Sequence, residues 1–183
     1  MAAVAGAWAA TVGATGQAAP ASKRMPDGKQ WMTENLAVPA EPSYCYDNSN
    51  EQCVKYGRLY TWASAQHACR ALGSGWRLPT NEEWYALAKH YGGLREETAD
   101  LGKAAFTALM VGGTSGFNAV LGGGLTDKSG EYQRADAHGF YWTASESGPD
   151  TAWMYNLGKG GQSVNRHASA EKLWGVAVRC VRD

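Results

Sequence analysis

The sequence predicts a single α+β domain, in which two helices pack on short antiparallel sheets joined by long glycine-rich loops. Three observations support this fold class. A capped helix begins after Pro79, apolar residues alternate along residues 151–157 as they do in a strand, and 23 glycines are too many for a helical bundle. The chain of 183 residues is long enough to bury one hydrophobic core.

Two elements are expected in the first half of the chain. Residues 29–36 have the composition of a strand. Residues 61–72 are expected to form a helix, because Ala65, Ala68 and Cys69 fall on one helical face. The second helix should follow soon afterwards.

The start of that second helix is the clearest local signal. Pro79 fixes its own φ and disfavours helix in the residue before it, so no helix continues through this point. Thr80 is a good N-cap, and Glu83 is placed to complete a capping box. We therefore expect a helix over residues 81–91 that buries Trp84.

The second half of the chain is less regular. Residues 94–134 are rich in glycine and weakly periodic, which predicts long loops with short strands. In the strand expected over residues 151–157, Met154 and Asn156 point away from the apolar face. Residues 165–172 have no regular period, so we expect an exposed excursion between two anchored strands.

Composition and spacing exclude several functions. With 17 basic and 17 acidic residues the net charge is zero, so neither nucleic acid nor an anionic membrane is an expected partner. His67, His90, His138 and His167 lack the spacing of a metal site. We expect no metal and no cofactor.

We divide the chain into an Ala/Gly-rich leader, residues 1–24, and a domain, residues 25–183. The leader contains too few large apolar side chains for a confident transmembrane span. It is either the remnant of an export signal or a helix that packs on the domain or on a neighbouring subunit.

Six motifs in one consistent order carry a family resemblance. They are DGKQWMTENL (27–36), YCYD (44–47), YGRLYTW (56–62), GWRLPTNEEW (75–84), YWTASE (141–146) and GVAVRC (175–180). Together they resemble the C-type lectin-like superfamily, in the branch that contains the formylglycine-generating (sulfatase-modifying) enzymes and the Fibrobacter succinogenes major paralogous domains. The second group is the more similar, and the resemblance implies a C-type lectin-like domain.

The resemblance also bears on the cysteines. Four cysteines permit three full pairings, among which the sequence alone does not choose. The resemblance implies Cys45–Cys53 and Cys69–Cys180 disulfides, and the alternative is four free thiols in a cytosolic protein. The formylglycine-generating relatives use a reactive cysteine pair, but no cysteine lies between Cys69 and Cys180. We therefore do not expect this protein to be an enzyme.

The C-terminal half has the segments GFYW (139–142), AW (152–153), VNR (164–166) and GVAVR (175–179) in this order. This pattern is similar to that of the variable proteins diversified by retroelements. Those proteins use the lectin-like fold and vary outward positions near the C-terminus to change ligand. Outward positions and their aromatic neighbours give the candidate ligand-binding residues: Tyr141, Ser147, Asp150, Thr151, Met154, Asn156, Asn165, His167, Ser169, Glu171, Leu173 and Trp174.

These observations favour a non-catalytic binding protein, such as an adhesin or a phage receptor-binding protein. It would be secreted, displayed on a cell surface or carried on a phage virion. Its partner would be a protein or glycan on another cell or surface, and a homo-oligomer is an open option. Two alternatives remain: a structural or assembly paralogue that buries its C-terminal face against a subunit, and a degenerate formylglycine-generating-type oxidase.

Overall fold

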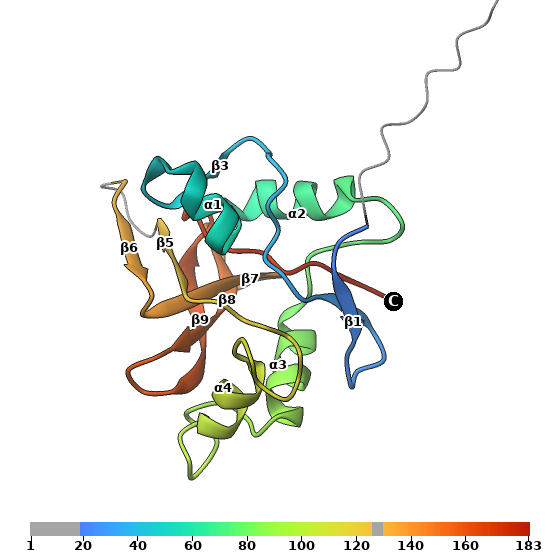
Figure 1. Cartoon of the computed structure of the whole chain (residues 1–183), viewed down its shortest axis with the longest axis vertical. Coiled ribbons are helices and arrows are strands. Elements are labelled where there is room, and N and C mark those ends of the chain that lie inside the picture. The colour runs from blue at the N-terminus through green and yellow to red at the C-terminus, as the bar shows by residue number, and fades with distance from the viewer. Residues whose placement is uncertain (1–18, 126–129) are drawn as a thin grey trace, which may run out of the picture.

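A computed structural model shows the arrangement of the chain (Figure 1) and describes residues 19–125 and 130–183. The strands are β1 (Ser22–Arg24), β2 (Gln30–Met32), β3 (Ser43–Tyr44), β4 (Leu59–Tyr60), β5 (Gly122–Leu125), β6 (Tyr132–Ala135), β7 (His138–Glu146), β8 (Thr151–Gly158), β9 (Ser163–Glu171) and β10 (Val181–Arg182). The helices are α1 (Asn50–Tyr56), α2 (Trp62–Ala71), α3 (Asn81–His90) and α4 (Lys103–Leu109), with a 3-10 turn at Tyr46–Asn48. The predicted α+β class is confirmed.

The largest sheet has five strands in the order β6-β5-β7-β8-β9. Its pairs are antiparallel except β5 and β7, which run parallel. Strands β7 and β9 are nine residues long, and β8 is eight. The expectation of short, purely antiparallel sheets therefore fails for this sheet.

Strand β9 corrects a second expectation, the irregular excursion over residues 165–172. The segment pairs with β8 from Ser163, opposite Gly158, to Glu171, opposite Thr151. An irregularity in the register between Ala152 and Met154 interrupts the alternation of side chains on β9. That interruption explains why the sequence shows no regular period.

A small sheet joins the two ends of the domain. Strand β2 lies between β1 and β10, with Trp31 opposite both Lys23 and Val181. Ser22–Arg24, at the end of the segment assigned to the leader, is thus part of this sheet as β1. The expectations for residues 1–18 lie outside the described residues.

Both predicted disulfides are confirmed. Cys69 in α2 pairs with Cys180 next to β10, across a separation of 111 residues. Cys45 pairs with Cys53 in α1, across a separation of eight. The first bond ties a helix to the C-terminal strand, and the second closes a small loop.

The two predicted helices are α2 and α3. The Thr61 hydroxyl caps α2 by accepting a hydrogen bond from the Ser64 amide. At α3 the Thr80 hydroxyl accepts from the Glu83 amide, while the Glu83 carboxylate accepts from the Thr80 amide at 2.8 Å. The capping box is therefore confirmed. Helices α1 and α4 were not predicted, and α4 lies in the region expected to be loop.

Each face of the large sheet is covered by a different helix, as Figure 1 shows with α2 on one side and α3 with α4 on the other. On the α3 side, Trp84 stacks on Tyr155 with ring centroids 5.2 Å apart, and Tyr141 lies 5.4 Å away. On the α2 side, Trp142 and Met154 pack against the helix and its disulfide. We call these the α3 face and the α2 face.

One charged side chain, Arg179, is buried in this core. Its guanidinium donates hydrogen bonds to the carbonyl oxygens of Met32, Phe117 and Asn118 and to the Asn35 side chain, at 2.6 to 3.1 Å. Burial lowers its pKa from the usual arginine value. Arg179 therefore links β2, the loop before β5 and the C-terminal segment. Within the described ranges, no helix is long and apolar enough to span a membrane.

Candidate functional site

A groove of about 380 Å³ opens on the α2 face, where α2 no longer covers the sheet. Phe140, Met154 and Ala170 give it an apolar, buried floor. Asn156 adds a buried amide to its base. Polar and aromatic side chains form its rim: Gln133, Arg134, His138, His167, Ser169 and Trp174. We call this feature the groove.

The register of β7, β8 and β9 explains why these residues meet. Residues directly opposite one another on antiparallel strands share a face. Trp142, Met154 and His167 form one such row across the three strands, and Phe140, Asn156 and Asn165 form the next. Strand pairing therefore positions the groove residues before any ligand arrives.

Hydrogen bonds hold the polar end of the groove. His138 stacks on Phe140 with ring centroids 5.6 Å apart. Its Nδ1 lies 3.0 Å from Asn156 Nδ2 and 3.3 Å from Asn156 Oδ1, and Arg134 Nη1 lies 3.4 Å from its Nε2. Because the Asn156 amide offers both a donor and an acceptor, it can hold either neutral tautomer of the ring.

Basic side chains line the groove and acidic ones do not. The lining includes the Arg134 guanidinium and the imidazoles of His138 and His167, and no carboxylate. Burial lowers the pKa of His167, an effect that Glu96 opposes and His138 strengthens. The groove thus presents hydrogen-bond donors above an apolar floor, which suits a ligand with an apolar body and a hydrogen-bond-accepting edge.

Five of the predicted ligand-binding residues line the groove: Met154, Asn156, His167, Ser169 and Trp174. Two of these lie deeper than expected. Met154 and Asn156 are each only 4% exposed, so they form the base of the groove rather than an outward surface. Phe140 and Trp142 on β7 flank them because the sheet continues on that side.

Four other predicted residues gather at the far end of β8, around the turn after β7. The Ser147 hydroxyl donates to the Thr151 hydroxyl at 3.0 Å, and Thr151 lies opposite Glu171. The Asp150 carbonyl oxygen accepts a hydrogen bond from the Lys172 amide at 2.9 Å. These residues form a separate rim and do not line the groove.

The remaining three predicted residues have different surroundings. Leu173 is 83% exposed, beside the groove residue Trp174. Asn165 donates from Nδ2 to Asn156 Oδ1 at 3.5 Å. Tyr141 corrects the prediction: it is fully buried on the α3 face, and its hydroxyl donates to the Val120 carbonyl at 2.8 Å. A ligand cannot reach Tyr141 without unfolding the core.

Sequence reasoning missed five residues that line the groove: Gln133, Arg134, His138, Phe140 and Ala170. A usable signal was present for part of this set. His138 and Phe140 alternate with Gly139 at the start of β7, on the same face as Trp142. Arg134 had no local signal, because β6 reaches the groove only through the pairing of β5 with β6 and β7.

Metal chemistry has no obvious centre in the parts of the chain that the structure describes. No group of three histidine, cysteine or acidic side chains there is arranged to hold an ion. The four cysteines are all in disulfides.

The comparisons with known proteins identify one family. The family model described as the Fibrobacter succinogenes major domain matches residues 21–182, which is nearly the whole chain. No curated protein and no solved structure matches the chain with significance.

Proposed function

The chain belongs to the Fibrobacter succinogenes major domain family, and from that premise we propose that it is a non-catalytic domain that binds a ligand in the groove. The fold is of the C-type lectin-like class. The ligand is a protein or glycan presented on another cell or surface. The observation that carries the proposal is the groove itself, with its apolar floor, its rim of donors and its rigid position on β7, β8 and β9.

The preorganisation of the groove supports binding. Its floor residues are buried in the core, and the Asn156 amide is held by hydrogen bonds to its neighbours. Little conformational entropy would be lost when a ligand binds such a surface. Trp174 adds a rigid aromatic wall beside small polar groups, a combination common in recognition surfaces.

Two further observations support a secreted or surface-displayed, non-catalytic protein. Disulfides form and persist mainly in oxidising compartments, and this small domain has two. A formylglycine-generating-type oxidase would need reactive thiols, whereas every cysteine here is already bonded.

In its sharpest form, the proposal includes diversification of the C-terminal surface by a retroelement. Ser147, Asp150, His167, Ser169 and Leu173 are exposed, so replacing them would change the surface without disturbing the core. Sequencing the locus tests this form. A reverse transcriptase gene nearby and a near-duplicate of the 3′ end that differs at adenines would support it, and a locus with neither would contradict it.

Neighbouring residues on β9 offer a matched test of ligand binding. Ser169 lines the groove, whereas Ala168, also exposed, faces the opposite side of the sheet. We expect Ser169→Trp to fill the groove and to lower binding at least tenfold to peptides selected from a phage-displayed library. Ala168→Trp should leave the binding of these peptides unchanged.

Circular dichroism and thermal unfolding of both variants would check that the fold is intact. Equal loss of binding in the two variants, or no loss in Ser169→Trp, would contradict the groove as the ligand site.

A second candidate function is that of a structural paralogue, in which this face is covered by another subunit. The exposure of Leu173 beside Trp174 favours it. Sedimentation of the full chain distinguishes the two functions. An oligomer that Leu173→Glu converts to a monomer, with no ligand found for the groove, would favour assembly.

A further inference from the structure

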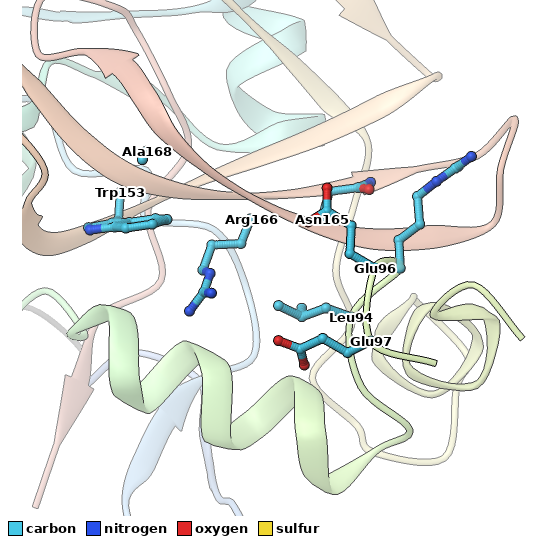
Figure 2. Close-up of a pocket in the computed structure, with 8 residues that line it drawn as sticks. Leu94, Glu96, Glu97, Trp153, Asn165, Arg166 and Ala168 are labelled. Atoms are coloured by element: carbon cyan, nitrogen blue, oxygen red, sulfur yellow. The ribbon is translucent and has the colours of Figure 1, made fainter. Parts of the chain in front are cut away.

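A second hollow lies on the α3 face of the same strands, behind the groove. Its volume is about 290 Å³. It is bounded by β8, β9 and the segment that follows α3, and its lining residues are Leu94, Arg95, Glu96, Glu97, Trp153, Asn165, Arg166 and Ala168. Figure 2 shows that Arg166 enters it from β9 and that Glu97 reaches towards Arg166 from the opposite side.

The four charged residues of the hollow are Arg95, Arg166, Glu96 and Glu97, so its net charge is zero. None of them makes an ion pair with any residue in the described part of the chain. Glu97 reaches towards Arg166 across the hollow, whereas the Arg95 guanidinium lies beside Gly161 in the turn between β8 and β9. Arg166 and Glu97 are therefore the donor and the acceptor that a ligand in the hollow would meet.

An aromatic wall completes the hollow. The Arg166 guanidinium lies 5.0 Å from the centre of the Trp153 ring and 5.3 Å from that of Tyr85 on α3. Contacts of this kind hold a guanidinium in place while its N–H groups stay available at the edge. Trp153 is only partly buried, so part of the indole is open to the hollow.

The backbone that carries the acidic residues is also fixed. The Arg95 amide donates to the Val164 carbonyl of β9 at 2.9 Å, and the Glu97 amide donates to the Leu94 carbonyl at 3.1 Å. The Thr98 hydroxyl donates to the same Leu94 carbonyl. The segment is thus bound to β9 and turned by its own hydrogen bonds, which keeps the spacing between Glu97 and Arg166.

We propose that this hollow binds a neutral pyranose ring, such as one monosaccharide unit of a glycan. A ligand that bridges a guanidinium and a carboxylate must accept a hydrogen bond from one and donate to the other, and a hydroxyl group does both. Adjacent ring hydroxyls supply several such groups on a compact frame. The C–H groups of the sugar pack on the exposed part of the Trp153 indole that Arg166 does not cover.

Other ligand chemistries fit less well. An anion bound to Arg166 would lie beside Glu96 and Glu97, and like charges at short range repel. A purely apolar ligand would cover four charged side chains without bonding them, which costs free energy. The proposal concerns a site separate from the groove and stands whether or not the groove binds a ligand.

Nuclear magnetic resonance titration of the full chain tests the proposal. The probes are methyl glycosides of glucose, galactose, mannose and N-acetylglucosamine, with sodium acetate and sodium sulfate at matched ionic strength. We expect at least one glycoside to shift the Trp153 indole signal and the amides of residues 94–97 and 165–168. The expected dissociation constant is on the order of 1 mM, because the ligand is small and the site is open.

Variants make the result specific. Trp153→Ala and Glu97→Gln should each weaken the glycoside at least fivefold. Ala168→Trp, an exposed substitution at the edge of the hollow, should do the same without touching the core. Trp174→Ala in the groove is the matched aromatic control and should leave the shifts of the Trp153 indole and of residues 94–97 unchanged.

Three results would overturn the proposal. These are no saturable shift with any glycoside, shifts that Ala168→Trp leaves unchanged, and saturable shifts produced by acetate or sulfate rather than by the glycosides. The last result would mean that Arg166 binds an anion.

Discussion

The α3 face and the α2 face are built from the same three strands, yet they differ in how far a helix covers them. On the α3 face, Trp84 packs its ring against Tyr141 and Tyr155, and the two tyrosine hydroxyls bond within the protein. On the α2 face, the row that begins with the buried Trp142 ends at the exposed His167.

This difference separates the residues that stabilise the fold from those that are available to bind a ligand. A side chain under α3 contributes to the core, whereas one on β9 beyond the edge of α2 contributes to a surface. Even two neighbours on β9 differ in this way: Ala168 lines the hollow on the α3 face, and Ser169 lines the groove on the α2 face. The effect of a substitution should therefore depend on whether a helix packs over the residue, and not on the position of the residue along its strand.

The largest effect is expected at the disulfide under the α2 face. Replacing Cys69 and Cys180 with alanine should lower the free energy of unfolding by about 4 to 5 kcal/mol, because the bond closes a loop of 111 residues. Urea denaturation followed by tryptophan fluorescence measures it. Replacing Cys45 and Cys53 is the control, and its shorter loop predicts roughly 2 to 3 kcal/mol. Equal losses in the free energy of unfolding would show that loop length does not determine how much each disulfide stabilises the fold.

Trp84→Ala tests the α3 face. The indole is fully buried among four aromatic rings, so the cavity should cost about 3 to 5 kcal/mol. The same denaturation experiment applies. Trp174→Ala, on the rim of the groove, should cost less than about 1 kcal/mol. A larger loss of stability for Trp174→Ala than for Trp84→Ala would contradict the assignment of Trp84 to the core and of Trp174 to a binding surface.

Thr80→Ala should have a moderate effect, about 1 kcal/mol, because it removes one half of the capping box of α3. Ala86 is exposed in the middle of α3 and takes no part in that box, so Ala86→Gln serves as a local control. Thermal unfolding monitored by circular dichroism compares the two variants. A Thr80 variant as stable as the parent would show that packing on Trp84 alone fixes the helix start.

The smallest expected effect is a pH dependence from His167. Its pKa is lowered in the folded state, chiefly by desolvation of the part of the ring that packs on the protein, so the folded state resists its protonation. The rest of the side chain is exposed, which keeps the effect small. The stability contributed by the neutral ring is therefore full above about pH 6.5, the usual histidine value, and declines as the pH falls towards the lower folded pKa.

Thermal midpoints of the parent and of His167→Gln at pH 7.5 and 5.5 measure this effect. The variant should lose less stability than the parent on acidification, and the difference between the two isolates His167 from other groups that titrate. An identical loss in both proteins would mean that His167 titrates as it does in the unfolded chain.

The sequence determined those elements whose signals lie within a few residues. Pro79, Thr80 and Glu83 set the start of α3 without help from the rest of the chain, since a proline and a capping box act on adjacent backbone groups. Alternation likewise marked residues 151–157 as a strand, now β8. The family resemblance supplied the disulfide pairing, which spacing alone left open.

Only the tertiary structure decided which side chains a ligand can reach. Tyr141, Met154 and Asn156 have ordinary strand positions in the sequence, and their burial follows from distant elements that pack above them. Strand β9 was hidden because its alternation breaks opposite β8, and Arg134 reaches the groove only through the pairing of β5 with β6 and β7. Exposure depends on what covers a face, and that cover comes from residues far away in the chain.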